Sequence, residues 1–224
     1  MRRATDEISV RDAMIEVDGH PFHGDLTVPA GATGLVLFAH GSGSSRHSPR
    51  NRFVADVLVE AGVATLLVDL LTQGEAHDRA NVFNVELLAH RLLEMSCWVE
   101  TAPETANLAL GYFGASTGAA AALVAAARSG QPIGAVVSRG GRPDLAGDWL
   151  ARVTAPTLLL VGSRDHVVLE LNRAALARIP GEKRLDIIPG ATHLFEERGT
   201  LEAVSAHAAD WFGRYLGRAR DPQG

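Results

Sequence analysis

The sequence is poor in several features that mark specialised classes of protein. Its 224 residues include a single cysteine, Cys97, so no disulfide can form within the chain. Cys97 lies in an apolar helical stretch, where we expect an inert, buried thiol. The longest apolar run, residues 119–127, is rich in alanine and too short to span a bilayer. Arg2 and Arg3 are not followed by the apolar segment of a signal peptide. We therefore expect a soluble cytoplasmic protein with no membrane partner.

Charge is also limited, and it is spread evenly. The formal net charge is −5, and the Lys and Arg residues are scattered without a basic stripe. This pattern argues against a nucleic-acid partner. The chain has no H-E-x-x-H motif and no cysteine pair, so we expect neither a metal site nor a cofactor.

What the sequence does contain is a regular alternation of strand-like and helix-like segments. The length suits one core, and we expect a single domain over residues 1–217 and a disordered tail at 218–224. Residues 8–18 and 21–28 alternate in polarity around an Asp-Gly pair, which predicts an antiparallel hairpin at a sheet edge. The remaining strands are expected at 35–39, 64–70, 108–113, 133–138, 156–162 and 185–188, and helices at about 51–61, 84–100, 119–127, 144–150, 168–179 and 200–216. This order predicts an α/β fold with a mostly parallel central sheet of about eight strands and helices on both faces.

One turn between a strand and a helix has the form of a nucleophile elbow. Residues 114–118 read Gly-Ala-Ser-Thr-Gly, after an apolar strand and before an alanine-rich helix. A G-x-S-x-G motif in this setting holds its serine at a sharp, strained apex, and the glycines remove the Cβ atoms that would clash there. Ser116 is thus a candidate nucleophile, although a plain packing turn would give the same pattern.

A serine nucleophile needs a base, and histidine titrates in the required range. His193 follows the last predicted strand in a Gly-Ala-Thr-His turn that can reach the elbow. His40 and His47 are competitors, since both lie in the loop after the first parallel strand. We expect His193 to be the base, because of its strand-end position and its place in the chain order.

A carboxylate must hold the histidine ring in one tautomer. Asp165 ends the strand that precedes the last one, and the order Ser116, Asp165, His193 is the order of an α/β-hydrolase triad. Asp165 also fits a turn or cap residue. Asp69 is a weaker alternative, and Asp144 fits a helix N-cap better.

An oxyanion hole requires two preorganised N–H donors. The first is expected at Thr117, directly after the nucleophile, and the second at Ser42, with Gly41 or Gly43 as alternatives. The loop residues His40, Gly41 and Gly43 are also candidates for substrate binding. A phosphate cradle is the rival interpretation of this glycine-rich loop, but the loop lacks the Gly-Lys-Ser/Thr ending.

Six segments together carry a family resemblance: His40–His47, Asp69–Thr72, Gly111–Gly118, Ser138–Asp144, Val161–Asp165 and Gly190–Phe195. They lie within residues 34–216, and the chain resembles the α/β-hydrolase superfamily and its dienelactone hydrolase-like branch. The resemblance implies a serine hydrolase of esters or lactones. Dienelactone hydrolase proper uses a cysteine nucleophile, whereas this chain has Ser116, so dienelactone itself is in doubt as the substrate. Similar chains also occur fused to phosphoribosyltransferase domains.

The sequence leaves little room for a cap over the site. About fifteen residues separate Gly141 from Pro156, too few for a separate cap domain. Aromatic residues make up only 5% of the chain, so we expect small or short-acyl substrates rather than a deep apolar pocket.

The sequence assigns no single role to four charged or titratable residues near the strand ends. Arg139 and Arg142 can pair with a substrate carboxylate, and Glu75 and His77 can line the same mouth. Solvated loop charges or internal ion pairs explain all four equally well.

The pattern as a whole predicts a serine hydrolase acting on small carboxylic esters or lactones through a Ser116–His193–Asp165 triad. The same triad would serve a thioesterase, a peptidase or an acyltransferase. The alternative of another class is a non-catalytic binding module on the same fold. The edge hairpin also leaves a homodimer open.

Overall fold

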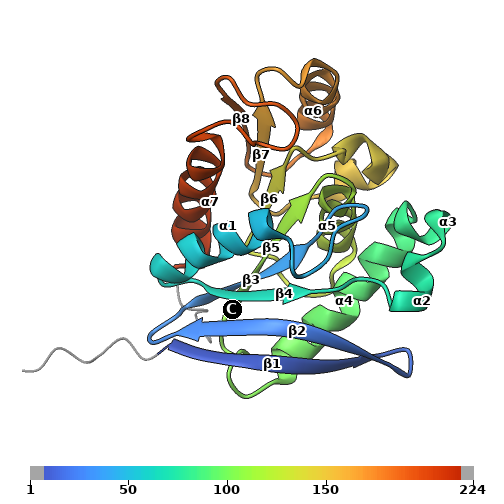
Figure 1. Ribbon diagram of the computed structural model, residues 1–224, viewed down its shortest axis with the longest axis vertical. Helices are drawn as coiled ribbons and strands as arrows, with labels where there is room; N and C mark the ends of the chain where they lie inside the picture. The colour runs from blue at the N-terminus through green and yellow to red at the C-terminus, as the bar shows by residue number, and fades with distance from the viewer. Residues whose placement is uncertain (1–7, 218–224) are drawn as a thin grey trace, which may run out of the picture.

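The computed structural model describes residues 8–217 of the chain, which form one eight-stranded sheet flanked by helices (Figure 1). The strand order across the sheet is β1-β2-β4-β3-β5-β6-β7-β8. The strands are β1 (Ile8–Val17), β2 (His20–Pro29), β3 (Gly34–Ala39), β4 (Ala64–Val68), β5 (Ala109–Ala115), β6 (Ala135–Arg139), β7 (Thr157–Gly162) and β8 (Lys183–Ile188). The helices are α1 (Pro49–Glu60), α2 (Gln73–Ala76), α3 (Arg79–Val82), α4 (Val85–Thr101), α5 (Thr117–Arg128), the 3₁₀ helix η1 (Pro143–Arg152), α6 (His166–Arg178) and α7 (Thr200–Leu216).

The N-terminal hairpin supplies the antiparallel part of the sheet. β1 pairs with β2, and β2 pairs antiparallel with β4, whereas every pairing from β4 to β8 is parallel. Asp18 and Gly19 join the first two strands with φ values of 52° and 74°. Positive φ at both central residues is what a two-residue type I′ turn requires. The predicted eight-stranded, mostly parallel sheet is confirmed.

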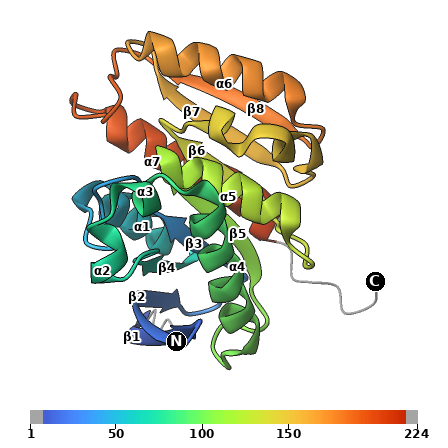
Figure 2. The same cartoon turned by 90° about the vertical axis from the view of Figure 1, so that its right-hand side faces the viewer.

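Helices cover both faces of the sheet, as Figure 2 shows. α1 and α7 pack on one face, where Val54, Leu58 and Phe212 are fully buried. α4, α5, α6 and η1 cover the other face, where Leu92 and Leu123 belong to a second buried cluster. The parallel strands β3 to β7 are therefore buried on both sides, which explains their mainly apolar sequences, whereas the edge strand β8 is largely exposed.

The connection between β6 and β7 contains no inserted domain. It consists of η1 and short loops, and η1 packs against α5 and α6. The loops that carry the predicted site residues follow β3, β5, β6, β7 and β8, so the parallel strands bring them to one end of the sheet.

Two features differ from the sequence-based expectation. The polar segment after β4, expected to be a loop, forms the short helices α2 and α3. Cys97 is exposed rather than buried, because α4 turns Leu92, Met95 and Val99 toward the sheet instead. Partial burial of Cys97, together with the nearby Glu94 and Glu100, raises the pKa of its thiol, so the thiol is not activated.

Among the described residues, no helix combines the length and the apolar character that crossing a bilayer demands. The predicted tail at 218–224 lies outside the described residues.

Candidate active site

The elbow places Ser116 at a strained position between β5 and α5. Its backbone adopts φ 51° and ψ −122°, a conformation that L-residues rarely occupy. The two flanking glycines make this geometry feasible. A Cβ atom at Gly114 would lie 2.4 Å from the Ala119 Cα, and one at Gly118 would lie 2.3 Å from the carbonyl oxygen of Ala39. The motif is thus required by close backbone packing as well as by the turn.

Backbone hydrogen bonds hold the elbow against the end of β6. The Ser116 N–H donates to the carbonyl oxygen of Arg139 at 3.2 Å, and the Ser116 carbonyl oxygen accepts from the Arg142 N–H at 3.1 Å. α5 begins directly after Ser116, and residues 117–125 are all buried. The serine is therefore presented from a rigid, packed support.

Asp165 and His193 meet at this end of the sheet. The Oδ2 atom of Asp165 lies 2.6 Å from Nδ1 of His193. Asp165 occupies the N-cap position of α6, but its side chain makes no capping hydrogen bond and contacts the imidazole instead. Since a carboxylate accepts, Nδ1 carries the hydrogen and Nε2 keeps a free lone pair. The His193 side chain is 40% exposed, so the imidazole is accessible from the surface.

Gly140 brings the histidine loop close to the elbow. A Cβ atom at this residue would lie 3.1 Å from the His193 carbonyl oxygen and 3.6 Å from its Nδ1. The preceding residue, Arg139, pairs with Ala115 and bonds the Ser116 N–H. The end of β6 therefore lies between the serine and the histidine and contacts both segments.

The loop after β3 lies on the other side of the elbow. A Cβ atom at Gly41 would be 3.1 Å from the Cβ of Ser116, so a larger residue would require the elbow to shift slightly. Gly43 has φ +68°, and the Ser44 N–H closes a turn on the Gly41 carbonyl oxygen. Within residues 8–217, neither the Ser42 N–H nor the Thr117 N–H donates to another protein group. Two free donors therefore lie beside Ser116.

The imidazole of His40 supports this loop. Its Nε2 accepts a hydrogen bond from the Leu70 N–H at 3.1 Å, and its Nδ1 lies 3.0 Å from the Gly41 carbonyl oxygen. A backbone N–H can only donate, so Nδ1 must carry the hydrogen and donate to Gly41. Burial lowers the pKa of His40, although the Gly41 hydrogen bond and Asp69 oppose the shift. Both ring nitrogens are used, so His40 is placed to fix the loop.

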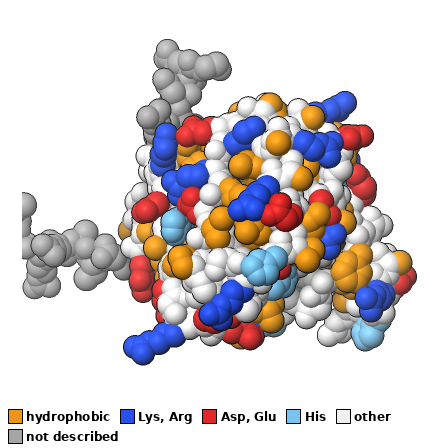
Figure 3. Space-filling view, turned by 90° about the horizontal axis from the view of Figure 1, so that it is seen from above, with side chains coloured by type: hydrophobic (Ala, Val, Ile, Leu, Met, Phe, Trp, Pro, Cys, Tyr) orange, Lys and Arg blue, Asp and Glu red, His pale blue; other side chains and the backbone are white. Residues whose placement is uncertain are grey.

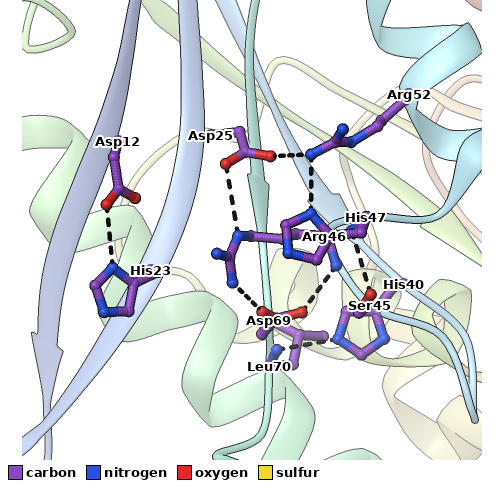
Figure 4. A network of polar contacts seen from close by, with 10 residues as sticks. All are labelled: Asp12, His23, Asp25, His40, Ser45, Arg46, His47, Arg52, Asp69 and Leu70. Carbon is purple, nitrogen blue, oxygen red and sulfur yellow. Dashed lines mark hydrogen bonds and ion pairs between the residues drawn. The ribbon is translucent and has the colours of Figure 1, made fainter.

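Arg46 anchors the far end of the same loop, as Figure 4 shows. Its backbone N–H and its guanidinium bind the two oxygens of Asp69, at 2.8 and 2.5 Å. Asp25 faces Arg46 Nε at 3.5 Å and also pairs with Arg52 at 2.8 Å. Arg52 in turn donates to Nδ1 of His47. Sequence reasoning missed this network, although Arg46 and Asp69 both stand in segments that carry the family resemblance.

Several candidates for substrate contact are held in internal ion pairs. Arg142 binds Asp144 through two hydrogen bonds of 2.8 Å, so Asp144 does not act as the expected helix N-cap. Glu75 accepts from the Thr72 N–H and pairs with Arg91. Burial alone would raise the pKa of Glu75, but these hydrogen bonds outweigh it and lower the pKa.

Arg139 differs from these residues. The residue is partly buried, and its Nη1 atom is buried with no hydrogen-bond partner among the described residues. Burial, with a smaller effect from the nearby charge of Arg50, lowers the pKa of Arg139 to about 10.

A cavity of about 640 Å³ lies beside the oxyanion loop, by which we mean residues 40–47. Ser116 and His193 are not among its lining residues, but Gly41 and Ser42 are. Its other walls come from β2, the end of β4, α2, α3 and α4, and are formed by Pro21, Phe22, His23, Asp69, Leu71, Thr72, Gln73, Ala76, Val82 and Leu88. The hairpin and the two unexpected short helices therefore enclose a space next to the elbow.

The face of the molecule in Figure 3 mixes acidic, basic and histidine side chains among hydrophobic ones. No group of three His, Cys, Asp or Glu side chains within residues 8–217 is arranged to hold a metal ion.

Comparison with known proteins places these features in a family. The model of the dienelactone hydrolase family matches residues 26–216. The crystal structure of dienelactone hydrolase from Anabaena variabilis is 53% identical, with a TM-score of 0.90 over 93% of this chain and 99% of that one. Est1E from Butyrivibrio proteoclasticus has a TM-score of 0.78 at 19% identity, over 92% of this chain and 99% of that one, which shows the shared α/β-hydrolase fold.

A curated relative from Mycobacterium tuberculosis (strain CDC 1551) is 62% identical over 94% of this chain. It carries the provisional name phosphoribosyl transferase. The match covers 46% of that protein, so the chain spans about half the length of the curated relatives it matches.

Proposed function

The chain belongs to the dienelactone hydrolase family, and on this premise we propose that it is a serine hydrolase of small carboxylic esters or lactones. The observation that carries the proposal is the 2.6 Å contact between Asp165 and His193, at the same end of the sheet as the strained Ser116. The Asp165 side chain is only 14% exposed, and its carboxylate contacts the imidazole instead of capping α6. A general base requires an orienting carboxylate of this kind.

The proposed reaction follows from the tautomer of His193, which carries its hydrogen on Nδ1. Nε2 of His193 removes the proton from Ser116 Oγ while this oxygen attacks the substrate carbonyl carbon. Asp165 holds the imidazole through Nδ1–H and stabilises the imidazolium that forms. His193 then gives the proton to the leaving alcohol oxygen, which departs and leaves an acyl-enzyme. In the second half, His193 takes a proton from water, the hydroxide attacks the acyl carbon, and Ser116 leaves with the proton returned.

The oxyanion of each tetrahedral intermediate is assigned to the N–H groups of Thr117 and Ser42. Thr117 is the first residue of α5, where backbone N–H groups lack helical partners and the helix dipole favours negative charge. Ser42 lies in the loop that Gly41 brings against Ser116. Loss of one such donor in other hydrolases costs about 10²- to 10³-fold in kcat.

Thioester, amide and acyl-transfer substrates use the same machinery, and activity assays on matched substrates separate them. The name phosphoribosyl transferase belongs to a relative about twice as long as the matched region. We assign to this chain the hydrolase chemistry, because its candidate site consists of a nucleophile, a base and an orienting acid.

Replacement of the nucleophile tests the proposal. We expect Ser116→Ala to lower kcat for 4-nitrophenyl acetate by about 10⁶-fold, whereas Ser9→Ala, on exposed β1, leaves it unchanged. Ester hydrolysis that survives Ser116→Ala in a folded protein would contradict the mechanism. A folded wild-type protein that hydrolyses no ester, thioester or amide would favour the binding-module alternative.

A further inference from the structure

We propose that the cavity beside the oxyanion loop binds the acyl part of the substrate and selects an uncharged, largely apolar acyl group. The inference rests on the proposed function, because it assumes that Ser116 is the nucleophile. It goes further in naming the chemical class that the site accepts.

The cavity borders the loop that contacts the proposed nucleophile. Gly41 and Ser42 line it, and Gly41 lies directly against Ser116. A carbonyl carbon held at Ser116, with its oxygen toward the Ser42 N–H, therefore directs one substituent along the wall of the cavity. A volume of about 640 Å³ lies within the range of small-molecule sites, about 300–1,000 Å³.

Part of the wall outside the loop is apolar. Phe22, Leu71 and Leu88 present buried side chains there, and Val82 of α3 is partly buried against the same core. Ala76 of α2 lines the opening and is exposed. Burying alkyl or aryl surface against this wall contributes to binding at about 25 cal/mol per Å².

No lining charge is free to bind an anion. Arg46 is neutralised by Asp69 and Asp25, and Arg52 shares Asp25 (Figure 4). The four charges sum to zero, so a carboxylated acyl chain would lose its hydration without gaining a counter-ion.

The lining histidines do not supply a cation either. His40 uses Nε2 as an acceptor and is neutral, and His47 accepts from Arg52 through Nδ1. His23 faces Asp12 at 3.3 Å. The uncompensated guanidinium of Arg139 is not among the residues that line the cavity.

The first experiment compares two esters that share a six-carbon acyl chain. 4-Nitrophenyl hexanoate ends in a methyl group, and the 4-nitrophenyl monoester of adipic acid ends in a carboxylate. We expect kcat/KM to be at least about tenfold higher for the hexanoate, since one uncompensated charge costs more than 1.4 kcal/mol. Equal values, or a preference for the adipate, would overturn the inference, and an adipate preference would point to Arg139 as the anion subsite.

The second experiment fills the cavity. We expect Ala76→Trp to lower the ratio of kcat/KM for hexanoate over acetate by about tenfold, because the indole occupies acyl space. Ala80→Trp is the matched control, since Ala80 is exposed on neighbouring α3 and does not line the cavity. An unchanged ratio in Ala76→Trp would overturn the inference.

Failure of the acyl-site inference differs from failure of the hydrolase proposal. If hexanoate and acetate are cleaved and Ser116→Ala abolishes both, the hydrolase proposal stands, and the two comparisons decide the cavity. If no ester is cleaved by the folded protein, both proposals fall together.

Discussion

Individual residues at the candidate site are placed by contacts that leave little freedom. Ser116 has a strained backbone conformation, which Gly114 and Gly118 permit. The carboxylate of Asp165 contacts His193 and does not cap the N-terminus of α6. His40, by contrast, uses both ring nitrogens to hold the oxyanion loop. The two histidines therefore differ in their hydrogen-bond partners, which supports assigning them different functions.

At the residue scale, the orienting role of Asp165 predicts a specific loss. Asp165→Asn keeps the size of the side chain, but an amide can donate a hydrogen bond as well as accept one. Donation from the amide to Nδ1 would favour the tautomer that carries its hydrogen on Nε2, which cannot act as the base. We expect kcat to fall by about 10³- to 10⁴-fold, with little change in the circular dichroism spectrum. Asp148→Asn, on an exposed ion pair with Arg178, is the control. A loss below about tenfold in steady-state assays would show that Asp165 does not orient the base.

The close approach at the elbow predicts a loss of stability. In Gly118→Ala the new Cβ would meet the Ala39 carbonyl oxygen at 2.3 Å, so backbone has to move. We expect the free energy of unfolding in urea to fall by about 2 kcal/mol. Gly130→Ala is the control, since nothing lies within 4 Å of its added Cβ. Equal stability of the two variants would contradict the packing argument.

At the scale of elements, the oxyanion loop is held at both ends by consecutive residues at the end of β4. His40 binds the Leu70 N–H, and Arg46 binds the carboxylate of Asp69. A loop without regular structure is thereby fixed against a strand end. The N–H groups that are proposed to stabilise the oxyanion depend on this attachment.

Loosening the attachment should affect the chemical step more than binding. In Arg46→Lys an ammonium group replaces the planar guanidinium that faces the carboxylates of Asp69 and Asp25, and it cannot contact both in the same way. We expect kcat for 4-nitrophenyl acetate to fall about tenfold while KM changes by less than about threefold, because oxyanion stabilisation acts in the transition state. Arg173→Lys, on an exposed pair with Glu170, is the control. A rise in KM with kcat unchanged would show that Arg46 contributes only to substrate binding.

The alternation of strands and helices was sufficient to predict the sheet and the hairpin, because apolar periodicity reports burial directly. The absence of an inserted cap followed from the short connection between Gly141 and Pro156. The helices α2 and α3 were missed because each has only four residues and none of them is fully buried. The Thr72-Gln-Gly-Glu75 sequence was the available signal, since it forms a capping box. The pairs Glu75–Arg91 and Arg46–Asp69 were beyond sequence reasoning, because ion pairs between distant segments depend on side-chain geometry. Arg142 and Asp144 are only two residues apart, but their pairing depends equally on how the two side chains are oriented.

At the scale of the whole molecule, the burial of His40 makes the free energy of unfolding depend on pH. In the folded protein burial lowers the pKa of His40 below its ordinary value of 6.5. The unfolded chain therefore binds the proton more readily, and the free energy of unfolding decreases as pH falls below about 6.5 toward the folded pKa.

His40→Gln removes this titration and should weaken the pH dependence of stability. We expect the loss of unfolding free energy between about pH 7.5 and pH 5 to be smaller in His40→Gln than in the wild type, as measured by urea titration at each pH. His20→Gln, at an exposed hairpin position, should match the wild type. Identical pH dependence in all three proteins would show that His40 does not titrate differently on folding.

The central claim is that Ser116 is a nucleophile activated by His193. The most direct measurement is labelling with a fluorophosphonate, followed by intact mass and peptide mapping, on the wild type and on His193→Ala. The account predicts one adduct, on Ser116, in the wild type and a large loss of that adduct in the variant. The account would be contradicted if the folded wild-type protein formed no adduct. It would also be contradicted if Ser116 were labelled to the same extent in His193→Ala as in the wild type.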